Sequence, residues 1–411
     1  MTHDDLGLFG QQDDTLPAPR AGGRRAARAL REQQRRRRKR RHRIVLAIAM
    51  VGFVLIGAIG YFGVRELLTL RDVPDYPGAG VGDVVIRVEQ GDSTSAIAAT
   101  LVEQDVVAGA AAFIRAAEGA SGIRGVQPGY YQLRSRMSGE SAVTLLLDSA
   151  ARVGQLEIRA GVQLDDVGLP DGSTVPGVLS RISQAGCARL NATDTCVSPN
   201  QLRAAIVETD PATLGVPGWA AAAVARVPDF RRVEGLIAPG NYDVRPGSTA
   251  VELMQQVLAT SSAFFQSVGM PTVAEDAGLD PYPVLVIASI VEREGIERDF
   301  GKVSQVIYNR LSDGMPLQMD STINYPLDRQ EVTTADGDRA RSGPYNTYLN
   351  PGLPPTPIGA PSDEAIAAAV TPEVGPWQYF VKCETDGTSC FTVTIEEHRA
   401  AVASAQARGI F

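Results

Sequence analysis

The hydrophobic and polar positions of the chain change pattern twice along its length. Residues 1–43 are polar without an apolar period, residues 44–64 form a run of 21 uncharged residues, and the remainder alternates short apolar runs with turn residues. At about 1.5 Å per residue the uncharged run makes a helix of roughly 31 Å, which matches the hydrocarbon core of a bilayer. The pattern therefore predicts a single N-terminal transmembrane helix at 44–64.

The charges on either side of this run predict its orientation. Eight Lys and Arg residues lie within 35–43, whereas the charges just after the run are mixed in sign. The positive-inside rule then places residues 1–43 in the cytoplasm and the residues after 64 outside the membrane. A cleaved signal peptide has a shorter n-region and a shorter apolar run, so we expect a retained anchor. Residues 1–43 should be a disordered basic tail, and residues 65–83 a linker.

The net charge excludes one class of partner. Residues 1–43 carry a net charge of +8 and the whole chain carries −8, so the remaining residues carry −16. The basic tail contains no interleaved aromatic residues and adjoins the apolar run. Its expected role is membrane topology and attraction to anionic lipid, and we expect no nucleic-acid partner.

Residues 84–150 show the order strand, helix, helix, strand. Val84–Val88 has the pattern of a strand, Gly91-Asp92-Ser93 that of a turn with a helix cap, and Gly129–Leu133 that of a second strand. Ser138–Asp148 should be a further helix. This order, with its Gly-Asp-Ser opening, resembles the LysM domain, a small peptidoglycan-binding module.

Residues 155–411 have a mixed α/β pattern, so the whole exterior part is expected to be α+β. Leu156–Arg159 should be a strand and Thr249–Thr260 a helix capped by Ser248, with the segment Ser180–Gly186 between them. The block Glu234–Tyr242 lies in a turn-rich connection.

Histidine and cysteine usage limits the chemistry. The chain has three His, of which only His398 follows the apolar run, so a zinc hydrolase or a Ser-His-Asp triad is disfavoured. We expect carboxylates to transfer protons, with no metal and no cofactor. The four cysteines form two close pairs outside the membrane, which predicts the disulfides Cys187–Cys196 and Cys383–Cys390. Four free buried thiols are the alternative.

One helix carries the candidate chemistry. Residues 284–291 are apolar on every side, which predicts a buried helix, and Glu292-Arg293-Glu294 follows before Gly295 as the predicted C-cap. A carboxyl group held against apolar surface has a raised pKa, as a general acid near neutral pH requires. Glu292 and Glu294 extend two different apolar stripes, so periodicity does not choose between them. Either carboxylate could instead pair with a neighbouring Arg.

The string Ala288-Ser289-Ile290-Val291-Glu292-Arg293-Glu294 resembles the active-site helix of the YceG-like endolytic murein transglycosylases. Further segments resemble that family in the same order, namely Glu234–Tyr242, Lys302–Leu311, Gly314–Thr322, Tyr345–Tyr348, Gly352–Ile358, Tyr379–Val381 and Phe391. The resemblance extends over about 234–398 closely and over 84–233 loosely. It implies a bacterial enzyme on the outer side of the cell membrane.

The resemblance implies cleavage of the MurNAc-β-1,4-GlcNAc bond within nascent glycan strands, which leaves 1,6-anhydroMurNAc ends and ends strand elongation. It places the single catalytic carboxylate on Glu292, and cell-wall synthases are possible partners. Six residues are expected to bind the sugars: Gln318, Asp320, Thr322, Tyr345, Asn346 and Tyr348. A hydrogen-bonded scaffold is the alternative role for these six.

The chain departs from the family pattern at one turn, where Ser389 replaces a His and a cysteine pair brackets the position. Two competing functions remain. One is a non-catalytic cell-wall binding or division protein with the same fold. The other is a peptidoglycan amidase or peptidase, which would need a free Cys383 or Cys390 beside His398.

Overall fold

The computed structural model describes residues 73–327 and 336–410. The predicted tail at 1–43 and transmembrane helix at 44–64 lie outside these ranges, as do residues 65–72 of the predicted linker. Within the described ranges no helix is both long enough and apolar enough to cross a bilayer.

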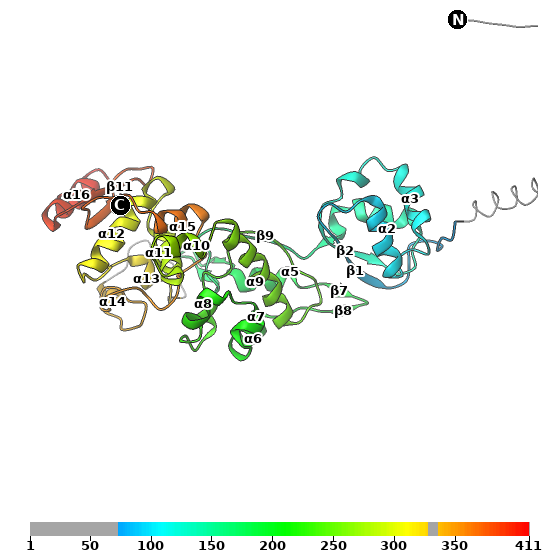
Figure 1. The fold of residues 1–411 in the computed structure, drawn as a ribbon, viewed down its shortest axis with the longest axis horizontal. Coiled ribbons are helices and arrows are strands. Elements are labelled where there is room, and N and C mark those ends of the chain that lie inside the picture. The colour runs from blue at the N-terminus through cyan, green and yellow to red at the C-terminus, as the bar shows by residue number, and fades with distance from the viewer. Residues whose placement is uncertain (1–72, 328–335, 411) are drawn as a thin grey trace, which may run out of the picture. The chain divides into compact units, whose positions relative to one another are not determined.

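The segment from 83 to 153 is a small antiparallel sheet with three helices (Figure 1). Its elements are β1 (Asp83–Val88), α2 (Thr94–Glu103), α3 (Ala110–Glu118), η1 (Ile123–Gly125), β2 (Gly129–Arg134), α4 (Gly139–Leu147), η2 (Ser149–Ala151) and β3 (Arg152–Val153). Strand β2 lies between β1 and β3, and Ile86 pairs with Tyr131. Alternate residues of β1 and β2 pack with Leu101 and Phe113 in one core.

The segment from 155 to 410 contains more helix than strand. Its first half comprises β4 (Gln155–Ile158), β5 (Val167–Gly168), β6 (Thr174–Val175), α5 (Val178–Ala185), β7 (Arg189–Leu190), β8 (Thr193–Asp194), α6 (Pro199–Glu208), α7 (Pro211–Leu214), α8 (Gly218–Val224), η3 (Phe230–Val233), β9 (Gly240–Asp243) and α9 (Ala250–Ser267). Its second half comprises α10 (Thr272–Asp276), α11 (Pro281–Glu294), η4 (Glu297–Asp299), α12 (Phe300–Ser312), α13 (Asp320–Asn324), α14 (Asp336–Arg339), α15 (Asp363–Val370), β10 (Tyr379–Lys382), β11 (Ser389–Thr392) and α16 (Ile395–Ala407).

Helix α11 is the buried centre of this segment (Figure 1). Asp280 caps its first turn by accepting a hydrogen bond from the Tyr282 N–H at 3.2 Å, and Pro281 occupies a first-turn position where no N–H is needed. All residues from Val284 to Val291 are buried, so the predicted apolar helix is confirmed. Helix α11 packs against α8, α12, α13 and α15, which places its C-terminal end among elements from several parts of the chain.

Two local predictions need correction. The helix expected at Thr249–Thr260 runs from Ala250 to Ser267, and its N-cap is Thr249 rather than Ser248. Thr249 and Glu252 form a capping box in which each side chain accepts the other residue's backbone N–H. A Glu three residues after the cap selects Thr249, because Ser248 has the apolar Val251 at that spacing.

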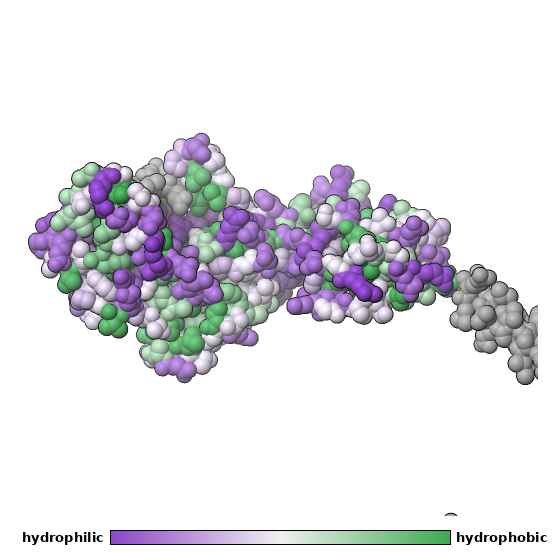
Figure 2. Space-filling view, turned by 90° about the horizontal axis from the view of Figure 1, so that it is seen from above, coloured by the Kyte–Doolittle hydropathy of each residue, from purple (hydrophilic) through white to green (hydrophobic). Residues whose placement is uncertain are grey.

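Strands β4 and β9 join two distant parts of the sequence. They pair antiparallel, with Leu156 opposite Tyr242, so the end of the Glu234–Tyr242 block is a strand rather than a turn. The predicted strand at Leu156–Arg159 begins and ends one residue earlier in the structure. On the face drawn in Figure 2, apolar patches are interspersed with hydrophilic residues.

Candidate functional site

The two carboxylates at the end of α11 have different partners. Ser362 donates to the Glu292 carboxylate twice, from its N–H at 3.0 Å and from its hydroxyl at 2.5 Å. The same hydroxyl accepts a hydrogen bond from the Ala365 N–H and thereby caps α15. Glu292 therefore ties the end of α11 to the start of α15.

Glu294 faces the polar loop that contains α13. Its Oε1 accepts a hydrogen bond from the Ser321 N–H at 3.1 Å, and part of the residue's surface stays open to solvent. Burial of the carboxyl group raises the pKa of Glu294, and the negative charge of Asp320 raises it further. The hydrogen bonding from Ser321 and the positive charge of Lys382 act in the opposite direction on this pKa. Glu294 is thus a half-buried residue whose carboxyl group has a raised pKa, the property that a general acid requires.

Three of the six predicted sugar-binding residues are half-buried or exposed, and two of them, Asp320 and Tyr348, interact electrostatically with Glu294. The Tyr348 hydroxyl donates to Asp320 Oδ1 at 2.6 Å, and Arg339 contacts the other oxygen at 3.4 Å. Gln318 is exposed, and its backbone N–H donates to the Thr347 carbonyl at 3.1 Å. Asp320 and Tyr348 therefore present polar groups near Glu294, and Gln318 is exposed two residues before Asp320.

The other three are buried and bonded within the protein. The Thr322 hydroxyl donates to the Met319 carbonyl, and the Tyr345 hydroxyl is 2.8 Å from that of Thr356. The Asn346 amide donates to the carbonyls of Arg339 and Arg341. These contacts are those expected of the scaffold role that the sequence left as the alternative, and sugar binding by Thr322, Tyr345 and Asn346 stays a prediction.

The β10–β11 hairpin lies on another side of the site. Lys382 pairs with Ser389 in the strand register, and the structure joins Cys383 to Cys390 just beyond them. The Ser389 N–H donates to Asp299 Oδ2 at 2.8 Å, so the position that departs from the family pattern is anchored to η4. A second disulfide joins Cys187 to Cys196, and no described cysteine is free.

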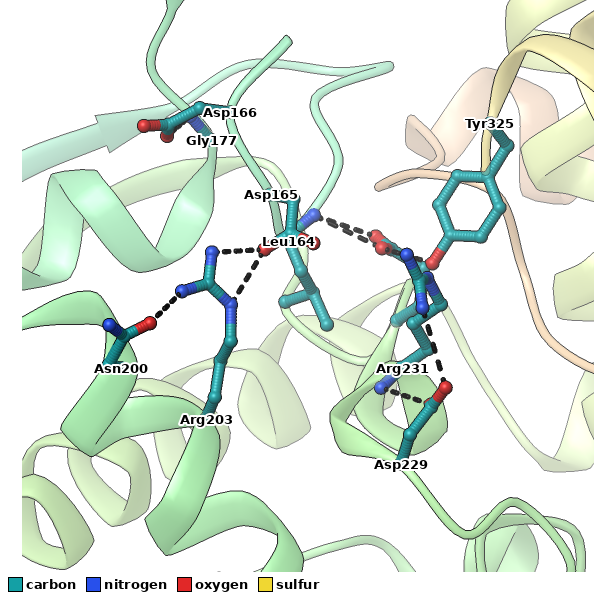
Figure 3. Close-up of polar contacts among 10 residues, drawn as sticks. Leu164, Asp165, Asp166, Gly177, Asn200, Arg203, Asp229, Arg231 and Tyr325 are labelled. Atoms are coloured by element: carbon teal, nitrogen blue, oxygen red, sulfur yellow. Dashed lines mark hydrogen bonds and ion pairs between the residues drawn. The ribbon is translucent and has the colours of Figure 1, made fainter. Parts of the chain in front are cut away.

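A second acid, Glu234, is buried and bonded to Leu164 and Tyr325, both of which are labelled in the network of Figure 3. Glu234 is 2% exposed and accepts a hydrogen bond from the Leu164 N–H at 3.1 Å and another from the Tyr325 hydroxyl at 2.7 Å. Burial raises the pKa of Glu234 to about 7. Tyr325 immediately follows α13 and packs on Tyr345 with ring centroids 4.8 Å apart. Glu234 therefore fixes the end of the loop that faces Glu294.

The sequence did not reveal several residues of the site. Ser321, Tyr325 and Lys382 had no assigned role, because their contacts join segments between 27 and 91 residues apart. Glu234 is the first residue of the Glu234–Tyr242 block, which the sequence analysis identified without giving Glu234 a role. Its position directly before Gly235 was the local feature that marked it.

Comparisons with known proteins agree with this architecture. The model of the YceG-like family matches residues 86–404. An endolytic murein transglycosylase of Bacillus subtilis is 26% identical over 321 residues, which cover 77% of this chain and 83% of the relative. One of Streptococcus pneumoniae is 31% identical over 182 residues, which cover 42% of this chain and 32% of the relative.

The fold is also found in a solved structure. The crystal structure of a YceG-like protein from Listeria monocytogenes superposes with a TM-score of 0.51 at 22% identity, covering 77% of this chain and 98% of that one. Since the family model matches well over half of its residues, the chain belongs to the YceG-like family.

Proposed function

We propose that the protein is an endolytic murein transglycosylase, a lyase that cleaves glycan strands of peptidoglycan at internal bonds. Family membership and the activity named for two relatives support the substrate class. The observation that carries the proposal is Glu294, a half-buried acid with a raised pKa that accepts a hydrogen bond from the polar loop at Ser321 and lies near Asp320 and Tyr348.

We assign the proton transfers to Glu294. The resemblance placed the catalytic carboxylate on Glu292, and that assignment stays a prediction. Both hydrogen bonds of Glu292 go to the cap of α15, which is a structural role. Glu294 accepts its hydrogen bond from the polar loop instead, and burial raises its pKa, which favours the protonated form.

One carboxyl group is enough for the reaction. Protonated Glu294 gives its proton to the glycosidic oxygen, the bond from that oxygen to C1 of MurNAc breaks, and GlcNAc leaves with a hydroxyl. The Glu294 carboxylate then takes the proton of the MurNAc C6 hydroxyl, whose oxygen bonds to C1 and closes the 1,6-anhydro ring. The acid is regenerated, and no water is consumed.

Product analysis tests this function. We expect the purified full chain, incubated with peptidoglycan glycan strands, to give shorter strands whose new ends are 1,6-anhydroMurNAc by mass spectrometry. A hydrolase would give reducing ends heavier by one water. Unchanged strands that nevertheless co-sediment with the protein would support the competing view of a non-catalytic cell-wall binding protein.

We propose in addition that residues 44–64 anchor the protein in the bacterial cell membrane with the site outside, near cell-wall synthases. An anchor raises the effective concentration of the enzyme at newly made strands. It thereby favours cleavage of these strands, which terminates their elongation. Removal of residues 1–64 should release a soluble protein that cleaves isolated strands at close to the full rate. A strict requirement for the anchor on isolated strands would contradict this prediction.

The segment 84–150 is proposed to be a LysM-like glycan-binding module, with the order strand, helix, helix, strand as support. A surface hollow beside α3 is lined by polar and apolar side chains, among them Thr94, Ile114, Ser121 and Arg124. A protein without residues 84–150 should bind insoluble peptidoglycan less well and still cleave soluble strands. Equal binding by both proteins would exclude this role.

A further inference from the structure

We propose that Ser321 is a positioning residue, which orients the Glu294 carboxyl group and determines which of its two oxygens carries the proton. This inference rests on the proposed function, since it takes Glu294 to be the acid and base. Ser321 is assigned no contact with the reacting bond.

The position of Ser321 makes its N–H available to Glu294. Ser321 is the second residue of α13, so its N–H belongs to the first turn and has no acceptor within the helix. It donates instead to Glu294 Oε1 at 3.1 Å. The contact therefore satisfies a donor that the helix itself leaves open.

The surroundings of α13 hold this donor still. The Thr322 hydroxyl is 2.8 Å from the Thr347 hydroxyl, and the Met319 N–H donates to the same Thr347 oxygen at 3.1 Å. Ser321 is 8% exposed, and its carbonyl accepts a hydrogen bond from the Tyr325 N–H at 3.0 Å. A donor fixed on both sides can orient a flexible carboxyl group, because moving it would break these contacts.

A fixed donor makes the two carboxyl oxygens unequal. In the protonated acid the carbonyl oxygen is the better hydrogen-bond acceptor, so an N–H on Oε1 favours Oε1 as the carbonyl and leaves Oε2 with the proton. After proton transfer the same N–H stabilises the carboxylate, since hydrogen bonding to the charged form favours that form. Ser321 thereby balances the burial that favours the protonated form of Glu294.

The hydroxyl group of Ser321 has a separate part in this arrangement. It lies near enough to Glu294 to lower its pKa, although it makes no hydrogen bond of good geometry to any described residue. The backbone N–H is therefore the group to which we assign the orientation. An experiment has to separate the two groups.

Several other charged or titratable groups face Glu294 and must stay unchanged in any test of pH dependence. They are Asp320 on α13, Lys382 on β10, Arg293 on α11, Arg310 on α12 and Tyr348 in the loop after α14. Substitutions confined to position 321 leave all of these side chains in place.

The test replaces the single N–H by an oxygen. Lactic acid incorporated at position 321 of the full chain differs from Ser321→Ala only in that its backbone link is an ester, so Ser321→Ala is the matched control. We expect the ester protein to lose about 10-fold in kcat relative to Ser321→Ala, the effect typical of one hydrogen bond to a charged group. The KM should change little, because Ser321 is not placed against the sugar.

The pH profile separates this role from a merely structural one. Loss of the N–H removes a group that lowers the pKa of Glu294, so the descending limb of kcat against pH should move to higher pH in the ester protein. An ester protein whose kcat and descending limb both equal those of Ser321→Ala would overturn the inference.

Glu294→Gln measured in parallel distinguishes a failure of the role of Ser321 from a failure of the assignments on which that role rests. An active Glu294→Gln overturns the assignment of the proton transfers to Glu294, and strands left uncleaved by the unchanged protein overturn the proposed function. An inactive Glu294→Gln beside an unaffected ester protein overturns only the role of Ser321.

Discussion

Glu294→Gln is expected to keep the fold and to lower the rate of strand cleavage by at least about 10²–10⁴, the contribution of a positioned acid and base. Gln has nearly the volume of Glu and can still accept the Ser321 N–H, but it has no proton to give at the pH of the reaction. Release of anhydro ends from purified strands measures the rate, and the midpoint of thermal unfolding checks the fold.

Glu292→Gln is the matched control two residues away. The Gln carbonyl can still accept both hydrogen bonds from Ser362, so α15 keeps its tie to α11. We expect this variant to retain more than about a tenth of the activity, far above the loss caused by removing a general acid. The opposite pattern, an inactive folded Glu292→Gln beside an active Glu294→Gln, would return the assignment to Glu292.

The choice between these two residues shows how far the sequence could lead. The apolar run at 284–291 and Gly295 were sufficient to predict the buried part and the C-terminal end of α11, because apolar patterning and capping are local properties of a helix. The partner of Glu292 lies 70 residues away and that of Glu294 lies 27 residues away. Helical periodicity gives the direction of each carboxylate but not the residues that contact it. The partners of Glu292 and Glu294 are therefore known only from the tertiary structure.

The polar loop gives a second example. Tyr345, Asn346 and Tyr348 are near neighbours in one motif, yet only Tyr348 bonds to Asp320 beside the acid, while the other two are buried. A loop has no repeating period, so the direction of each side chain depends on long-range contacts. The motif therefore predicted where the site is but not which of its residues face it.

Glu234→Gln should stabilise the protein at alkaline pH relative to acidic pH, because burial raises the folded-state pKa of Glu234 to about 7. Well below its ordinary pKa of 4.5, the carboxyl is protonated in the folded and unfolded states alike. Between 4.5 and about 7 the folded protein keeps a proton that the unfolded chain has lost, so the free energy of unfolding falls as pH rises. Above about 7 the whole cost of the buried charge is present, on the order of 3 kcal/mol for a shift of this size.

Gln cannot ionise, so the variant escapes this pH-dependent cost while it still accepts the hydrogen bond of Tyr325. The difference in unfolding midpoint between Glu234→Gln and the unchanged protein should therefore increase from pH 5 to pH 8. Glu252→Gln is the control, since Glu252 is an exposed capping residue whose pKa its hydrogen bonds with Thr249 lower. Its effect should change little over the same range, because Glu252 is already ionised in the folded protein. A difference in unfolding midpoint that stays constant from pH 5 to pH 8 would contradict this prediction. It would mean that Glu234 is ionised in the folded protein over the whole range, and hence that burial does not raise its pKa.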